Sequence, residues 1–262
     1  MTPLGHDRHC DEVVGQTALL RSHLDGADLT AVVPTCPDWT LWQLAVHVGA
    51  SHRWAEHIVR TGAAEEVAVE DVAGAEEPEG GAAALDTWLA EGAERAAGTF
   101  RGAGAGLPAW SWAWERTAGF WARRMAHETL VHRADAAGTT GARYEVAPDL
   151  AADAIDEWLQ IVRFGQRTDP DDPVNELRAV GRSIHLHATG SAPELDAEWL
   201  IGVTGEGVDR RRGHEKATVV LRGPLTELLL ALYRRLPPDD GRLEVLGERE
   251  ALDLWLERTS FG

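Results

Sequence analysis

Residues 35–57 read TCPDWTLWQLAVHVGASHRWAEH and contain the clearest helix start in the chain. Thr40 and Gln43 form a capping-box pattern, in which each side chain bonds a free backbone N–H of the first helical turn. One face of the following segment collects apolar and small residues and one histidine at helical spacing: Leu44, His47, Val48, Ser51 and Ala55. We therefore predict a helix that ends near Thr61 and turns one histidine toward a helical core.

Three further segments of the first half have helical periodicity: residues 7–24, 82–97 and 117–137. We predict that Gly138 ends the last of them as a C-cap glycine. Residues 63–80 are acidic and rich in Ala, Gly and Glu, so we expect a mobile connection without an element. Residues 109–114 alternate Trp with small residues, and we expect a loop packed on the helices. Four such helices predict a bundle.

The second half changes from a helical to an alternating pattern. A helix is predicted after Pro148, and strands are predicted at residues 183–188, 198–204, 218–222 and 243–246. Two more helices are predicted at residues 225–235 and 248–258. We therefore expect an α+β protein, with a helical bundle at 1–143 and a small α+β domain at 144–262.

Charge and cysteine content exclude several classes of partner. The chain has 262 residues, with 25 Lys and Arg against 43 Asp and Glu, which gives a net charge of −18. Such a surface repels nucleic acids and anionic membranes, and no apolar run approaches the roughly 20 residues that span a bilayer. Cys10 and Cys36 are too few for a disulfide framework. We expect a soluble cytosolic protein with no nucleic-acid or membrane partner.

The segment HETLVH at residues 127–132 carries the strongest chemical pattern. Helical residues four apart differ by only about 40° in direction, so Glu128 and His132 can share one ligand. His47 is the best third ligand, because it continues an apolar helix face. Two imidazoles and one carboxylate leave an open position on a divalent metal, as in catalytic zinc sites, and non-haem Fe(II) uses the same ligands. The alternative for Glu128 and His132 is an ordinary surface pair.

Other candidates have two readings each. The tryptophans at 110, 112 and 114 wall a pocket near the metal or simply pack in the core. His185 and His187 share one face of a predicted strand, where they pair on a metal or form a polar face. We expect Arg124, one turn before Glu128, and Trp114 to contact a cofactor or an anionic substrate.

Three stretches resemble one known family. They are TCPDWT at 35–40 with AVHV at 45–48, HETLVHRAD at 127–135, and the region from Ala217 through the Leu-rich run to Arg235. They resemble the mycothiol-dependent maleylpyruvate isomerase family, within the wider DinB-like metalloenzyme superfamily. The last stretch is similar to the family's sterol-carrier-like second domain, so the resemblance covers nearly the whole chain.

The resemblance implies a DinB-like four-helix bundle whose divalent metal, usually zinc, is held by His47, Glu128 and His132. It implies that the thiol of mycothiol takes the open metal position and attacks a small electrophile. The thiol is released again in an isomerase of the maleylpyruvate type, and it stays on the product in an S-transferase. Bacillithiol or glutathione would be alternative thiols, although the Ala- and Gly-rich composition suggests GC-rich coding and hence mycothiol.

The resemblance also implies a catalytic arginine from the second domain. Arg235 is the best counterpart by its place after the Leu-rich helix, with Arg234 almost as good, and a solvated helix-end charge is the alternative. Asp135 either orients His132 as a hydrogen-bond acceptor or caps Arg133. The competing function is a non-catalytic module that binds a small molecule or lipid and needs no open metal position.

Overall fold

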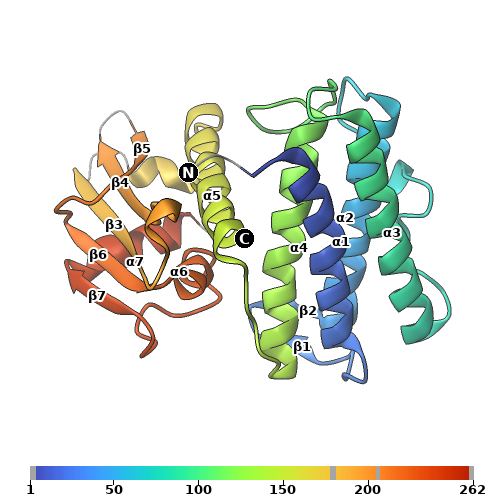
Figure 1. The fold of residues 1–262 in the computed structure, drawn as a ribbon, viewed down its shortest axis with the longest axis horizontal. Coiled ribbons are helices and arrows are strands. Elements are labelled where there is room, and N and C mark those ends of the chain that lie inside the picture. The colour runs from blue at the N-terminus through green and yellow to red at the C-terminus, as the bar shows by residue number, and fades with distance from the viewer. Residues whose placement is uncertain (1–3, 178–180, 205–206, 260–262) are drawn as a thin grey trace. The chain divides into compact units, whose positions relative to one another are not determined.

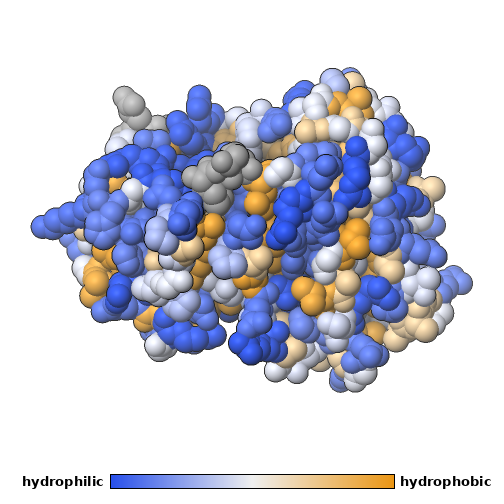
Figure 2. Space-filling view, in the orientation of Figure 1, coloured by the Kyte–Doolittle hydropathy of each residue, from blue (hydrophilic) through white to orange (hydrophobic). Residues whose placement is uncertain are grey.

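The computed structural model describes residues 4–177, 181–204 and 207–259. Two compact units divide the chain, Leu4–Tyr144 and the part that begins at Glu145. Within the described ranges, no helix combines the length and the apolar character needed to cross a membrane. Hydrophilic residues cover most of the face seen in Figure 2, as expected where 26% of residues are charged.

The N-terminal unit is a bundle of four helices (Figure 1). They are α1 (His6–Leu24), α2 (Leu41–Thr61), α3 (Gly81–Ala103) and α4 (Ala118–Thr140). Helix α1 packs on α3 and α4, and α2 packs on the same two helices. The core therefore lies between all four helices; α1 contributes Cys10, Val13, Leu20 and Leu24, and the other three helices contribute alanines together with leucines or aromatic residues.

A short hairpin leads into α2. Strand β1 (Val32–Val33) pairs antiparallel with β2 (Cys36–Thr40), whose last residue is the N-cap of the helix. The predicted capping box is confirmed, because Thr40 accepts from the Gln43 backbone N–H and Gln43 accepts from the Thr40 backbone N–H. The hairpin thus joins the start of α2 without a flexible linker.

The predicted end of α4 was wrong. The helix continues through Gly138 to Thr140 and ends at Gly141, whose φ of 70° is left-handed. Gly138 lies within the last turns of α4. The Thr139 and Thr140 hydroxyls that follow it donate to the main-chain carbonyls of Asp135 and Ala136. A glycine ends a helix where the chain needs a positive φ, and only the later glycine adopts one here.

The prediction for residues 63–80 was also wrong. The segment contains the short helix η1 (Val69–Asp71), and Val72 and Ala75 are buried. Three indole N–H groups from the flanking helices bond to it: Trp42 to Glu77 Oε1, Trp54 to the Val67 carbonyl and Trp88 to the Gly74 carbonyl. The composition of residues 63–80 could not reveal these hydrogen bonds, because the indole donors belong to the flanking helices.

The C-terminal unit combines helices with a five-stranded sheet of order β5-β4-β3-β6-β7. The strands are β3 (Arg182–Thr189), β4 (Glu198–Thr204), β5 (Gly207–Arg212), β6 (Val219–Pro224) and β7 (Glu244–Gly247). The helices are α5 (Pro148–Thr168), α6 (Leu225–Leu232), α7 (Arg249–Arg258) and two short ones, η2 (Pro173–Leu177) and η3 (Pro193–Leu195). Strands β3 and β6 are parallel and the other pairs are antiparallel, so the predicted α+β class is confirmed.

Helix α6 is one turn shorter than predicted. It ends at Leu232, because Arg234 adopts a left-handed φ of 60° and the chain turns. The Arg235 and Leu236 backbone N–H groups then bond to the Leu230 carbonyl, which closes the helix end. Arg235 therefore lies in the turn after the helix.

Candidate metal centre

Glu128 on α4 lies between two histidines. Its Oε1 atom is 3.0 Å from His47 Nε2 and 3.1 Å from His132 Nε2. Glu128 and His132 are one turn apart on α4, and His47 reaches them from the second turn of α2. The two rings are almost perpendicular, with centres 5.0 Å apart. The structure thus brings the three predicted ligands to one point, where His132 is buried and the side chains of His47 and Glu128 are 35% and 26% exposed.

Asp135 binds the ring nitrogen of His132 that faces away from Glu128. Its Nδ1 atom lies 2.9 Å from Asp135 Oδ2, and Asp135 is fully buried. The Thr35 hydroxyl donates to the other oxygen of Asp135 at 2.6 Å. Because Nδ1 donates to this carboxylate, Nε2 is left to face Glu128. The interpretation of Asp135 as the acceptor that orients His132 is confirmed.

Glu128 and His132 stabilise each other's charged forms. Burial favours the neutral ring of His132, but its hydrogen bonds to Asp135 and Glu128 raise its pKa to about 9. Burial likewise opposes ionisation of Glu128, yet hydrogen bonds from His132 and His47 and the charge of Arg124 hold its pKa well below the usual value. Without a metal, His132 is therefore a cation that lies against the Glu128 anion.

Arg124 takes the second oxygen of Glu128. Its Nη2 atom donates to Glu128 Oε2 at 3.0 Å from one turn earlier on α4, and the arginine is only 5% exposed. This ion pair fixes the carboxylate plane and leaves Oε1 for the two histidines. Arg124 was expected to contact a cofactor or substrate, and the structure places it on the carboxylate itself.

The hairpin supplies residues that sequence reasoning missed. Thr35 bonds Asp135, and the Trp39 ring packs on His47 and His132 at centre distances of 4.7 and 5.9 Å. Both residues belong to the TCPDWT stretch, so the motif itself was a signal for them. It could not reveal their contacts with α4, which lies about a hundred residues away along the chain.

The donor set fits a divalent metal. Two imidazole nitrogens and one carboxylate oxygen converge, and a protonated His132 is needed to explain the pair with Glu128 when no cation is bound. A metal ion would take the place of that proton, because metal ligands bind in their deprotonated form. The hydrogen bond from Nδ1 to Asp135 is the usual support of a metal-binding histidine. His47, Glu128 and His132 are thus suited to hold the ion.

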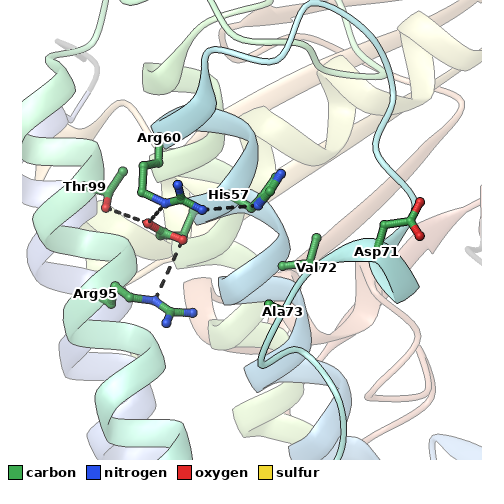
Figure 3. A pocket seen from close by; sticks show the side chains of 8 residues that line it. His57, Arg60, Asp71, Val72, Ala73, Arg95 and Thr99 are labelled. Carbon is green, nitrogen blue, oxygen red and sulfur yellow. Dashed lines mark hydrogen bonds and ion pairs between the residues drawn. The ribbon is translucent and has the colours of Figure 1, made fainter.

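The other histidines of α2 face different surroundings, as their spacing predicts. His52 is fully buried and donates from Nε2 to the Thr129 hydroxyl at 2.7 Å. His57 lies on a separate hollow of about 530 Å³ between α2, α3 and the η1 segment (Figure 3). There Arg60, Arg95 and Thr99 surround the Glu56 carboxylate, and the Asp71 carboxylate also lines the hollow, so two acidic groups balance the two arginines. The hollow is therefore no obvious anion site.

One predicted cofactor contact, Trp114, lies away from this cluster within the N-terminal unit. Trp114 packs edge-on against Phe120 and is 37% exposed, and Phe120 precedes Glu128 by eight residues, about 12 Å along a helix. Trp110 packs with Trp54 and Trp121, and Trp121 is fully buried, so these rings form core. Arg235 belongs to the C-terminal unit, where its Nη1 donates to the Tyr233 carbonyl at 2.8 Å.

Family comparisons cover both units. Residues 10–137 match the mycothiol maleylpyruvate isomerase N-terminal domain, and residues 149–254 match the C-terminal domain of the same proteins. The chain belongs to the mycothiol maleylpyruvate isomerase family. The predicted membership is thereby confirmed, and the three converging residues fall within the N-terminal match.

Solved structures agree at the level of the fold. The mycothiol-dependent maleylpyruvate isomerase superposes with a TM-score of 0.56 at 15% identity, covering 95% of this chain and 97% of that one. A mutant of that isomerase, named H52A in its own numbering and not in that of this chain, gives the same values. A comparison with curated proteins finds no match. The likeness at this low sequence identity concerns the fold.

Proposed function

We propose that this member of the mycothiol maleylpyruvate isomerase family is a thiol-dependent enzyme with a divalent metal on His47, Glu128 and His132. One observation carries the proposal: the Nε2 atoms of both histidines lie 3.0 and 3.1 Å from the same oxygen of Glu128. Zn²⁺ suits this mixed set of nitrogen and oxygen donors, and three protein ligands leave a position open. Mycothiol, named by the family, is the thiol that would use it.

The bound metal would lower the pKa of a thiol, so that a thiolate forms near neutral pH. The protein's own side chains prepare this chemistry. Asp135 keeps His132 in the tautomer that presents Nε2, and Arg124 keeps the Glu128 carboxylate in place. Trp39 covers His47 and limits its rotation. The substrate is a small electrophile, and the reaction is an isomerisation of the maleylpyruvate type or a thiol S-transfer.

Metal and thiol dependence can be tested together on tag-free protein. We expect His47→Ala to contain one equivalent of metal less than the wild type and to lose at least 100-fold in activity with mycothiol. His57→Ala is the matched control, since it lies on the same helix but faces the separate hollow. Elemental analysis measures the metal, and mass spectrometry follows mycothiol with maleylpyruvate and other electrophiles.

The products separate the two reactions. An isomerase returns free mycothiol with a rearranged substrate, whereas a transferase yields a stable thiol adduct. Equal metal content in the wild type, His47→Ala and His57→Ala would overturn the metal site. Metal loss in His47→Ala, without any mycothiol-dependent product from the wild type, would retain the site and reject the thiol chemistry.

A further inference from the structure

The C-terminal sheet carries a second group of metal-binding side chains, which we name the sheet cluster: His185, His187, Glu198 and His214. One ligand atom of each lies within 4.8 Å of those of the others. The distances to Glu198 Oε2 are 2.7 Å from His185 Nε2, 3.1 Å from His187 Nδ1 and 2.7 Å from His214 Nδ1. The cluster shares no residue with the centre in the helical bundle.

Strand register explains how the sheet cluster forms. His187 pairs directly with Glu198 across β3 and β4, and His185 is two residues away on the same face. The neighbouring pair, Leu186 and Trp199, points to the opposite face, where both are fully buried. The sheet cluster thus lies on the face of β3 and β4 opposite to Leu186 and Trp199.

His214 joins from the segment that follows β5. The Gly213 backbone N–H donates to the Glu198 carbonyl at 3.2 Å, which holds this segment beside β4. The His214 side chain is 72% exposed, whereas that of His185 is only 4% exposed. Four side chains from three parts of the chain therefore meet at the surface, and the His185 side chain among them is buried.

Hydrogen bonding alone does not account for this convergence. A carboxylate oxygen has about two lone pairs, so it accepts about two hydrogen bonds with good geometry. Here three imidazole nitrogens lie within 3.1 Å of the same oxygen. One imidazole is therefore in excess in a purely hydrogen-bonded network, whereas all four side chains can direct a lone pair at a central cation.

Ring geometry agrees with a tetrahedral ion. Zn²⁺ binds imidazole nitrogen at about 2.0–2.1 Å, so rings that share one ion have their centres about 5 Å apart. The three ring pairs of the sheet cluster have centres 5.1, 5.6 and 5.6 Å apart, with interplanar angles of 73–88°. Three nitrogens and one oxygen also disfavour Mg²⁺ and Ca²⁺, which prefer oxygen ligands throughout.

We propose that His185, His187, Glu198 and His214 form a second metal site, which binds Zn²⁺ or a similar divalent transition metal. Because the protein supplies four ligands, the site is closed and structural. Its effect is to fasten the segment after β5 to strands β3 and β4. The proposal does not depend on the function assigned to the helical bundle.

The test uses full-length, tag-free protein that carries His47→Ala, so that the bundle centre does not contribute. After chelation, Zn²⁺ is titrated against a competing chromogenic chelator. We expect one bound equivalent, and at least a 100-fold weaker affinity when His187→Ala and His214→Ala are added. Glu198→Gln keeps the side-chain shape and should weaken binding at least tenfold. Glu215→Gln is the control, since Glu215 adjoins His214 but pairs with Arg211.

A structural site has a second readout in thermal stability. Zn²⁺ should raise the melting temperature of the His47→Ala protein and of its Glu215→Gln derivative, but not that of the variant without His187 and His214. Circular dichroism verifies that each variant is folded. If the variant with both His187→Ala and His214→Ala does not fold, Glu198→Gln replaces it in the comparison. The proposal is overturned if the His47→Ala protein binds no Zn²⁺, or binds it equally well with and without the sheet cluster.

Discussion

Single hydrogen bonds decide what each histidine of α2 can do. His47 contacts Glu128, whereas His52 donates to Thr129, whose hydroxyl is itself committed as a donor to the Met125 carbonyl. The His52 ring therefore carries its proton on Nε2. Its Nδ1 atom is buried and has no hydrogen-bond partner. A second proton on His52 would place a charge and an unpaired donor inside the bundle.

We predict a pH effect on stability from His52. Burial, assisted by the charge of Arg53, lowers its pKa from 6.5 to about 4. Between these values the unfolded chain binds the proton and the folded chain does not, so stability falls as the pH drops from 6.5 toward 4. The contribution is up to about 3 kcal/mol, from 1.36 kcal/mol for each pKa unit.

His52→Gln tests this effect, because glutamine keeps an amide donor for Thr129 but does not titrate. Urea unfolding at pH 7, 6, 5 and 4 gives the free energy for both proteins. The difference between wild type and variant should shift by up to about 3 kcal/mol against the wild type across this range. Parallel pH profiles would contradict the prediction.

At the scale of elements, α2 and α3 approach closely through reciprocal glycines. Gly49 of α2 leaves room for the Trp88 ring of α3, and Gly92 of α3 leaves room for the Arg53 guanidinium of α2. Arg53 lies over the Trp88 ring at 3.9 Å and donates to the Gly49 and Trp88 carbonyls. The large side chains are thus held in place and cannot easily move aside.

Gly49→Ala should therefore destabilise the protein although alanine favours helices. The new Cβ would overlap the Trp88 ring, and overpacking of this kind costs about 1–3 kcal/mol. Gly98→Ala, at an exposed position in the C-terminal part of α3, meets nothing and should be neutral or stabilising by about 0.5–1 kcal/mol. Chemical unfolding of both variants measures the contrast, and equal stabilities would refute the close packing.

At the scale of the whole molecule, each unit builds its own core and its own group of histidines. The bundle centre lies within the match to residues 10–137, and the sheet cluster lies within the match to residues 149–254. The C-terminal unit also contains Arg235, which we propose as a catalytic residue on the basis of the family resemblance. It is half-buried in the turn after α6, whereas Arg234 is exposed.

We expect Arg235→Ala to lower kcat/KM at least tenfold, because a lost cation no longer stabilises charge on an anionic substrate. Metal content should stay unchanged. Arg234→Ala is the neighbouring control and should retain the wild-type kcat/KM. Steady-state kinetics of the mycothiol-dependent reaction provides the measurement. A larger loss in Arg234→Ala would reverse the two assignments.

Sequence alone determined what depends on near neighbours along the chain. The capping box at Thr40, the i, i+4 pair of Glu128 and His132, and the shared strand face of His185 and His187 all follow from local geometry. The helix ends at Gly138 and Arg235 were misjudged, since a positive φ is settled by how the chain must turn next.

Only the tertiary structure decided which distant groups meet. It brought His47 to Glu128 across 81 residues and Thr35 to Asp135 across 100. It also added Glu198 and His214 to two strand histidines, and indole donors to an acidic segment expected to be without structure. The physical reason is that periodicity reports the direction of a side chain within its own element. Which residue that side chain contacts depends on how separate elements pack.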